Sequence, residues 1–440
     1  MATTITPTIV NVNTTVQASP TVSQLQQSVA IISTGGTTLA TGSYQYEGQL
    51  SGVTAILAAP LAISTISWLS SVATVTTVGT LQQAVGQTFT VTIAGAVPAA
   101  YNGTYLATVT GTDIFTYALS ANPGVETTPG TYTPGNSAAV NNAATTFFAQ
   151  GSSVGVYVLE LGPQTTDAVA ITALQTWLTA NASPQPFYAY LTPNTWDTQA
   201  AAVNTLAANY ESPSGQTYFV VTASSGNVTL YAANKAVLTV TPSPTAASTE
   251  FQAAAVLYNI AVNNPGLANK LAPMQYRYLY GVTPWVQKGN SVTINTVLTG
   301  DGNLIMTGAE GGISTAALYK GTTMDGTQFS NWYGIDWFRV QVKQALAAAI
   351  INGSNGQPPL LYDQSGINTL LAIAQQVGNS AVSFGCAQSV TVTAVPFYTY
   401  TQANPTNYNS GIYNGLSATL VGQNGFLTVT FNLTAQQFAV

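Results

Sequence analysis

The sequence predicts a mixed α/β protein of several domains with one inserted all-β module, and three stretches carry this prediction. Residues 140–265 alternate buried strand patterns with amphipathic helix patterns. Residues 71–134 are rich in Thr and Val and are divided by Gly and Pro turns. Residues 329–352 form one long segment of helical periodicity. A chain of 440 residues is long enough for two to four domains with their own cores.

The N-terminal third combines an arm with a strand-rich module. Residues 1–16, with Ile9, Val10 and Val12 among Thr, Asn and Pro, predict an extended arm with one short strand. Residues 29–33 predict a buried strand. Between 71 and 134 the runs TVTTV, TFTVTIAG, YNGTYLATV and DIFTYALS alternate like strands. These runs predict an all-β module, whose aromatic residues are either core or a glycan-binding surface.

The middle of the chain predicts an α/β layer with a mainly parallel sheet. The strands are expected in SVGVYVLELG, PFYAYL and TYFVVTAS, and the helices in TTDAVAITALQTWLTAN, NTWDTQAAAVNTLAANY and STEFQAAAVLYNIAVNN. Thr165-Thr166-Asp167 supplies the polar residues that begin a helix. No GxGxxG follows these strands and no GxxxxGK[ST] occurs, so a nucleotide site is not indicated.

The segment 329–352 predicts a helix with two different faces. Apolar residues recur at steps of three and four and predict a buried stripe, which consists of Ile335, Phe338, Val342, Leu346, Ala349 and Ile350. The charged residues on the other side are Asp336, Arg339 and Lys343. Two interpretations remain open for them, a solvated face with a weak ion pair and a contact surface. Downstream, the sequence predicts a second amphipathic helix around residues 367–373, strands at 390–400, and a terminal strand at 426–433.

Charged residues are scarce and unevenly placed. They make up 5% of the chain, so the surface consists mainly of hydroxyl and amide groups, which favours association. Residues 1–234 contain seven acids and no Lys or Arg, and residues 235–343 contain all seven basic residues. Without a basic cluster, direct nucleic-acid binding is not expected.

The residues available for catalysis are few, and no cofactor or metal site is expected. Histidine is absent, which excludes imidazole bases and His-ligated metals. Cys386 is alone in an apolar run and predicts a buried small side chain. A pair of acids near a Gly-rich loop, Asp301 and Glu310, is the one candidate for glycoside hydrolysis, and turn-forming acids are the simpler interpretation. Neither a signal peptide nor a membrane helix is expected, so we expect a protein made in a cytoplasm.

The order of several motifs resembles the tail sheath proteins of contractile-tailed bacteriophages. The motifs are TIVNV, AATTFFAQGSSVGVYVLELG, GTTMDGTQFSNWYGIDWFRVQVKQAL, PPLLYDQSGI and a terminal strand. The resemblance spans most of the chain except about residues 71–134, which look like an inserted immunoglobulin-like module. The ending TAQQFAV departs from the Gly/Ala-rich ending of the family, which puts the last residues in doubt.

The resemblance implies a multidomain sheath fold. Its expected parts are an N-terminal arm (1–25), the first part of the core (26–70), the inserted module (71–134), an α/β domain (135–285), a C-terminal domain facing the tube (286–420) and a C-terminal arm strand (421–440). The arms of such proteins add strands to a neighbouring subunit's sheet. The matching positions here are Ile9, Val10, Val12, Phe426, Leu427, Val429, Phe431 and Leu433.

The resemblance further implies a structural, non-enzymatic subunit. Such subunits form six-membered rings stacked helically around a tail tube, with a baseplate and a tail terminator at the ends. The expected location is the virion tail, after assembly in the host cytoplasm, and the expected role is contraction for genome delivery. On the helix, Asp336, Arg339 and Lys343 would face an acidic tube. Two alternatives remain, an extracellular surface-array or adhesin protein and, less favoured, a virion-associated polysaccharide hydrolase.

Overall fold

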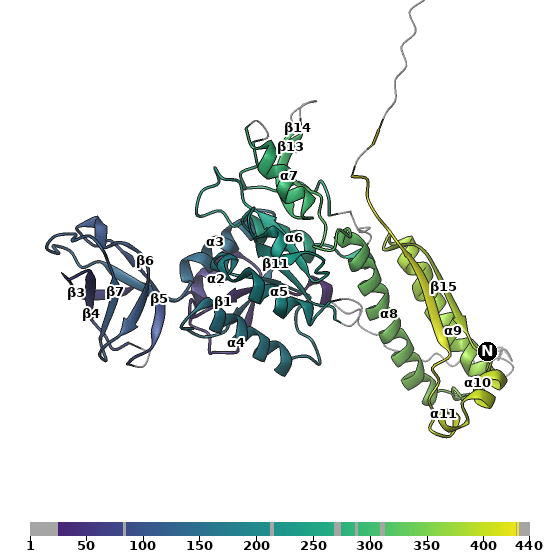
Figure 1. Cartoon of the computed structure of the whole chain (residues 1–440). Coiled ribbons are helices and arrows are strands. Elements are labelled where there is room, and N and C mark those ends of the chain that lie inside the picture. The colour runs from purple at the N-terminus through teal and green to yellow at the C-terminus, as the bar shows by residue number, and fades with distance from the viewer. Residues whose placement is uncertain are drawn as a thin grey trace, which may run out of the picture. The chain divides into compact units, whose positions relative to one another are not determined.

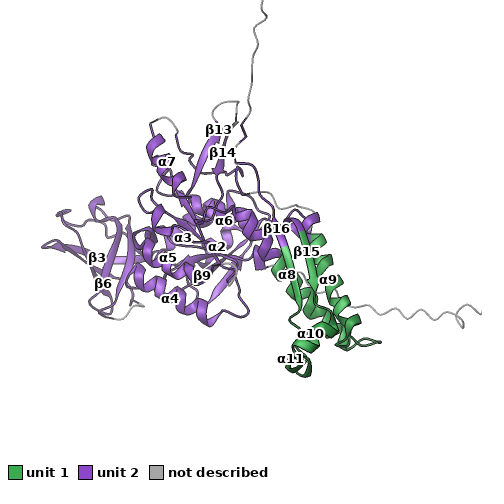
Figure 2. Ribbon diagram, turned by 45° about the vertical axis from the view of Figure 1, so that its right-hand side comes forward, with its two compact units in different colours: residues 1–23, 338–380, 390–419 green, residues 24–337, 381–389, 420–440 purple. Residues whose placement is uncertain are grey.

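The computed structural model describes residues 25–81, 85–211, 215–267, 274–286, 289–308, 313–427 and 429–430. The chain divides into two compact units (Figure 2). The larger unit is built around residues 24–337 and 381–389, and the smaller around residues 338–380 and 390–419.

An eight-stranded sheet forms the centre of the larger unit (Figure 1). Its order is β14-β13-β12-β11-β10-β1-β9-β2. The strands are β1 (Val29–Ser33), β2 (Tyr44–Glu47), β9 (Val156–Glu160), β10 (Ala189–Leu191), β11 (Tyr218–Thr222), β12 (Val237–Thr241), β13 (Asn303–Gly308) and β14 (Ile313–Tyr319). The six central strands run parallel, and β2 and β14 run antiparallel to their neighbours. The predicted mainly parallel sheet is therefore confirmed.

Helices cover this sheet on both faces because its strands are apolar on both sides. In β1, Val29 and Ile31 point into one core and Ala30 and Ile32 into the other, as the alternation of side chains along a strand requires. The first core includes residues of α2 (Leu50–Ile56), α3 (Ser137–Phe148) and α6 (Gln252–Ala261), and the second those of α4 (Asp167–Ala180), α5 (Ala200–Ala208) and α7 (Ser291–Thr299). Thr166 caps α4 by accepting a hydrogen bond from the backbone N–H of Val169, as its position predicted. Short 3₁₀ helices link some of these elements: η1 (Leu25–Gln27), η2 (Ala99–Tyr101), η3 (Asn194–Gln199), η4 (Val228–Tyr231) and η5 (Pro265–Leu267).

The all-β module is confirmed, and its strands close into a single antiparallel barrel of order β3-β4-β7-β6-β5-β8. They are β3 (Leu61–Leu69), β4 (Val72–Thr77), β5 (Thr88–Ala94), β6 (Gly103–Val109), β7 (Ile114–Ala118) and β8 (Thr131–Pro134). An immunoglobulin-like module would have two packed sheets, whereas closure leaves no open edge. Because β3 belongs to the barrel, the module begins before residue 71. Its interior is filled by buried residues that include Phe89, Phe115 and Tyr132, so these aromatic side chains are core.

The predicted long helix is confirmed as α8 (Phe329–Ser354), and the boundary between the two units falls within it, after Trp337. The second predicted helix is α9 (Gln364–Ser383). Strands β15 (Ala387–Ala394) and β16 (Leu416–Gly422) form a separate two-stranded sheet. The predicted strand at 397–400 is wrong, because Pro396 ends the extended segment and α10 (Phe397–Ala403) follows, and then α11 (Pro405–Asn409).

Candidate functional site

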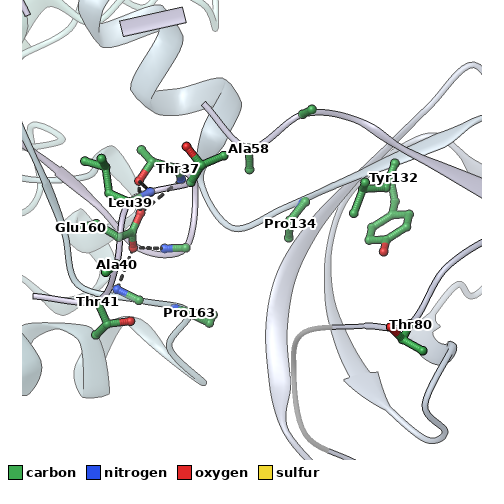
Figure 3. A pocket seen from close by; sticks show the side chains of 15 residues that line it. Thr37, Leu39, Ala40, Thr41, Ala58, Thr80, Tyr132, Pro134, Glu160 and Pro163 are labelled. Atoms are coloured by element: carbon green, nitrogen blue, oxygen red, sulfur yellow. Dashed lines mark hydrogen bonds between the residues drawn. The ribbon is translucent and has the colours of Figure 1, made fainter. Parts of the chain in front are cut away.

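The larger unit has a crevice at the position where open α/β sheets bind ligands. That position lies at the carboxyl ends of the strands, where the strand order reverses. Here it reverses at β1, which lies between β9 and β10. β1 ends at Ser33 and leads into the Gly-rich loop 34–38, while β9 ends at Glu160. A cavity of about 730 Å³ opens beside this loop, as Figure 3 shows.

Glu160 lines this cavity, and its carboxylate occupies the backbone donors of the loop. Only 1% of the residue is exposed. The side chains of Ser33 and Thr37 donate hydrogen bonds to it, each at 2.7 Å. The backbone N–H groups of Gly35, Thr37 and Gly162 donate at 2.6, 3.1 and 2.6 Å (Figure 3). The backbone donors that would hold a bound phosphate in an open crevice are therefore directed at a side chain of the chain itself.

These hydrogen bonds hold the loop after β1 against the end of β9, so the carboxylate has a structural role in the crevice. An ionised carboxyl offers about four lone-pair positions, and five donors already occupy them. The loop in turn holds the two segments that connect the barrel. Gly36 accepts a hydrogen bond from the backbone of Ala58, in the incoming segment, at 2.9 Å. The side chain of Asn136, in the outgoing segment, accepts one from the backbone of Thr34 at 2.8 Å.

Asp336 corrects the expectation for α8. It is fully buried in the larger unit, and its Oδ2 accepts hydrogen bonds from the hydroxyls of Tyr188 at 3.0 Å and Tyr218 at 2.8 Å. Burial, together with the neighbouring Asp336 and Tyr218, raises the pKa of Tyr188 well above its ordinary value, so Tyr188 remains a donor. The expectation that Asp336 lies on a solvated face is wrong, because the first turns of α8 are packed in the core.

The two basic residues of α8 lie in the smaller unit. Lys343 is exposed and Arg339 is half-buried, and the four-residue spacing places them on one face of the helix. The predicted buried stripe holds at Phe338, which is 8% exposed, but not at Ile350, which is 49% exposed. Asp336 and Arg339 are three residues apart in one helix, and the boundary between the two units falls between them.

The predicted arm residues fall mostly outside the described part of the chain. Ile9, Val10, Val12, Phe431 and Leu433 lie there. Phe426 and Val429 are 83% and 75% exposed, and no strand is formed at residues 423–427 and 429–430. Leu427 accepts a hydrogen bond through its backbone oxygen from the hydroxyl of Tyr276 at 2.6 Å.

Among the described residues, the other candidates from the sequence form no catalytic arrangement. Asp301 forms an ion pair with Lys320 at 3.0 Å, and its proposed partner Glu310 lies outside the described residues. Within the described ranges, no group of three or more acidic or Cys side chains is placed to hold a metal ion. Cys386 is buried, as predicted, and burial raises the pKa of its thiol to about 12.

Sequence reasoning missed three glutamines whose side-chain amides form hydrogen bonds with backbone N–H and C=O groups, as a neighbouring strand would. Each accepts from a backbone N–H and donates to a backbone carbonyl, and the members are Gln150 with Tyr280, Gln328 with Gly425, and Gln375 with Val390 and Val392. The amide-rich, charge-poor composition is the signal for such contacts in general. It does not identify these three glutamines, because their backbone partners are between 15 and 130 residues away.

No protein-family model matches the sequence, and no curated protein matches it. Solved structures do match. A chain of the anti-feeding prophage baseplate is similar over 97% of this chain and 98% of its own, with a TM-score of 0.57 and 12% identity. A chain of the contracted helical sheath of the anti-feeding prophage is similar over 97% of this chain and 99% of its own, with a TM-score of 0.52 and 13% identity. A sheath tail protein from Listeria innocua is similar over 90% of this chain and 94% of its own, with a TM-score of 0.47 and 11% identity.

The first two matches extend over nearly the whole of both chains, so the likeness concerns the complete architecture and not the α/β sheet alone. Among the described residues, no helix is long and apolar enough to cross a membrane. The resemblance inferred from the order of motifs is confirmed at the level of the fold. The chain has the fold of the subunit that forms the contracted helical sheath of the anti-feeding prophage.

Proposed function

We propose that the chain is the structural subunit of a contractile tail sheath. It polymerises helically around a tail tube and contracts to drive the tube through a bacterial envelope for genome delivery. The observation that carries this proposal is the full-length likeness to a chain of a contracted helical sheath. The neutral, amide-rich composition supports it, because such a surface favours association between copies.

The proposal assigns no catalytic role to any residue. The hydrogen-bond donors in the crevice that an α/β enzyme would use are occupied by Glu160, which accepts five hydrogen bonds. The partners are further copies in six-membered rings, the tail tube protein, the baseplate and a tail terminator. The place of action is the tail of the virion, after assembly in the host cytoplasm. Neither nucleic acid nor membrane insertion is part of this function.

The arms and the two units have separate roles in the proposal. The segments around residues 8–12 and 426–433 act as arms that add strands to the sheet of a neighbouring copy. The barrel, extended to include β3, is an inserted module. The C-terminal domain begins after Trp337 and not at residue 286, because β13 and β14 belong to the sheet of the larger unit. Arg339 and Lys343 lie on the face of α8 that contacts an acidic tube. Weak exposed charge contacts suit an interface that must be released on contraction.

Negative-stain microscopy of the protein expressed alone tests the main proposal. Hollow tubes or stacked six-fold rings are expected, because copies without a tube and baseplate should form the low-energy contracted lattice. Flat two-dimensional sheets would instead indicate a surface-array protein. A protein that stays monomeric at all concentrations would contradict the sheath proposal.

Charge reversal tests the contact with the tube. Lys343→Glu together with Arg339→Glu should reduce assembly around purified tubes while polymers of the sheath subunit alone persist. Gln376→Glu, which adds an exposed acid to α9 in the same unit without a change of size, is the matched control. Unchanged assembly of the double variant around the tube would rule out this interface.

A further inference from the structure

The beginning of α8 binds two segments that are far apart in the sequence. One is the N-terminal root, residues 25–28, which leads directly into β1 inside the sheet. The other is the C-terminal root, residues 423–427, which follows β16. The first residues of β16 belong to the smaller unit. The C-terminal root is therefore attached to the larger unit by non-covalent contacts.

The N-terminal root is bound on two sides before β1 begins. The Nε2 of Gln26 donates a hydrogen bond to the backbone carbonyl of Tyr333, in α8, at 3.0 Å. Gln26 is 6% exposed and Tyr333 is 1% exposed, so water competes little for this bond. The Nδ2 of Asn264, which follows α6, donates to the Oε1 of Gln27 at 3.2 Å. These contacts connect the N-terminal root with α8 as well as with the sheet.

The C-terminal root is held by side chains at the start of α8. The amide of Gln328 accepts a hydrogen bond from the N–H of Gly425 at 2.7 Å and donates to the carbonyl of the same residue at 2.9 Å. The hydroxyl of Ser330 donates to the carbonyl of Gln423 at 3.4 Å. We call these three hydrogen bonds of Gln328 and Ser330 the clip. The clip is the link between the C-terminal root and α8.

Two further contacts lie on either side of the clip. Gly422 approaches Asn331 so closely that a Cβ atom at residue 422 would come within 1.6 Å of the Oδ1 of Asn331. The hydroxyl of Tyr276 donates to the carbonyl of Leu427 at 2.6 Å, and the backbone N–H of Tyr276 donates to Leu318 in β14 at 2.7 Å. The C-terminal root is thus bound to the larger unit along its whole described length.

The first two turns of α8 are fixed to the middle of the sheet. The Oδ2 of Asp336 accepts hydrogen bonds from Tyr188, which directly precedes β10, and from Tyr218, the first residue of β11. β10 and β11 are neighbouring strands inside the sheet. The ring of Phe329 packs against that of Tyr218 with 5.0 Å between the centroids. A pull on this part of α8 is therefore opposed by buried contacts with two strands.

The strand pair of the smaller unit is a weaker support for the C-terminal root. Among the described residues its sheet contains only β15 and β16. Every residue of β16 is exposed or half-buried. A sheet of two strands has little stability of its own. Without the clip, a pull on the C-terminal root would act through the chain on β16.

We infer that the first two turns of α8 carry tension between the two roots, and that the clip keeps this tension from acting on the strand pair β15–β16. The inference rests on the proposed sheath function, in which copies are joined through their terminal segments and contraction pulls on those segments. Tension that enters at the N-terminal root passes through the sheet and α8 to the C-terminal root. The barrel and the smaller unit are not part of this path.

Single-molecule pulling with optical tweezers tests the inference on the full chain, with handles fused to its two ends. Opening of the smaller unit should release roughly 30 nm, the length of residues 338–422 when extended, which identifies the event. The double variant Gln328→Leu with Ser330→Ala removes the clip. At a constant force we expect the lifetime before this event to be shortened roughly tenfold or more, because three hydrogen bonds are lost.

Gln376→Leu is the matched control, because Gln376 is exposed on α9 and the change of side chain is the same. It should leave the lifetime unchanged. Circular dichroism and gel filtration check that each variant is folded, and Gln328→Leu alone serves if the double variant is not. An unchanged lifetime without the clip, or equal shortening by Gln376→Leu, would overturn the inference.

A second pulling geometry separates a path of tension from a general loss of stability. One handle stays at the N-terminal end, and the other is attached to Gln376→Cys, so that the force no longer passes through the C-terminal root. The buried thiol of Cys386, with its raised pKa, does not compete for the handle. In this geometry the clip variant should have the same lifetime as the chain with an intact clip. Equal shortening in both geometries would show that the clip only stabilises the smaller unit.

Failure of this inference and failure of the proposed function can be told apart, because pulling is done on single copies. If the wild-type protein forms neither tubes nor rings, the sheath proposal fails, and the lifetimes still show whether the clip bears tension. If the wild type assembles and loss of the clip leaves the lifetime unchanged, the sheath proposal stands and the path of tension is wrong.

Discussion

Glu160 and Asp336 are buried carboxyl groups in the described part of the chain, and both accept hydrogen bonds from neutral donors. Glu160 has two hydroxyls and three backbone N–H groups, and Asp336 has two tyrosine hydroxyls. A buried ion pair would require a second charge to leave water, which costs several kcal/mol. Neutral donors stabilise the carboxylate without that second cost. In this chain, of which 5% is charged, hydroxyl and backbone donors therefore contribute to the stability of buried acids.

The variant Glu160→Gln tests the contribution of the five hydrogen bonds to the Glu160 carboxylate. The NH₂ group of the glutamine would face groups that are themselves donors, and the charge-assisted hydrogen bonds to the carboxylate would be lost. We expect the free energy of unfolding to fall by about 2–3 kcal/mol in urea titration. Glu47→Gln is the control, since Glu47 receives one exposed side-chain hydrogen bond, and its loss should cost less than about 0.5 kcal/mol. Equal effects of the two changes would show that the five bonds are not stabilising.

The thiol of Cys386 gives a second prediction at the scale of one residue. Burial raises its folded-state pKa to about 12, compared with about 9 when exposed. The folded state favours the neutral thiol. The resulting contribution to the free energy of unfolding is fully present below pH 9 and is lost as the pH rises from 9 to 12. At pH 8 a disulfide reagent should therefore modify the native protein very slowly and the urea-unfolded protein within minutes. Rapid modification of the native protein at pH 8 would contradict the buried position.

At the scale of elements, α8 shows what periodicity can and cannot predict. Its extent follows closely from the sequence, because apolar spacing is a local signal, and the predicted segment 329–352 differs from the observed helix only at its C-terminal end, Ser354. The burial of Asp336 does not, since its partners lie 148 and 118 residues upstream. A helical wheel assigns a charged residue to the exterior, and only the tertiary structure supplies the two hydroxyls that reverse the assignment. The hydrogen bonds of Gln375 with the backbone of Val390 and Val392 were missed for the same reason, because they depend on the approach of α9 to β15.

The tyrosine pair that anchors α8 can be tested directly. Tyr218→Phe removes a hydrogen bond of 2.8 Å to a buried carboxyl, so the free energy of unfolding should fall by about 1.5–3 kcal/mol. Tyr188→Phe should have a similar effect, and the double variant should show coupling between the two through Asp336. Tyr278→Phe, at a residue 52% exposed, should change stability by less than about 0.5 kcal/mol. Strict additivity of the pair in urea titration would argue against a shared acceptor.

For the whole molecule, sequence patterns predicted the sheet, the helices and an all-β module, because each leaves a periodic signal within one segment. The closure of the module into a barrel was not predictable in this way, since β3 pairs with β4 and β8, and β8 is more than sixty residues away. The position of the crevice follows from strand order, which the sequence did not reveal. The arms were assigned from a resemblance and stay a prediction, as their residues lie mostly outside the described part.

The barrel should be removable without loss of the core. It has its own hydrophobic core, and its two connecting segments lie together, with the hydroxyl of Ser137 3.3 Å from the carbonyl of Ala58. A variant that joins Ala59 to Gly135 through two glycines should keep its far-UV circular dichroism per core residue and melt within a few degrees of the full chain. Removal of residues 103–118 alone opens the barrel and should instead cause aggregation. Unfolding of the barrel-free variant would show that the two parts stabilise each other.

Removal of the Glu160 side chain would leave the donors of the crevice without their acceptor. Glu160 is in effect a ligand that the chain carries with it, and a shorter side chain at this position would leave an empty receptor for an anion. In Glu160→Gly the N–H groups of Gly35, Thr37 and Gly162 would still converge on the vacated volume. Acetate or formate added from solution would then restore the lost stability with the logarithm of its concentration, and the protein would become a carboxylate sensor.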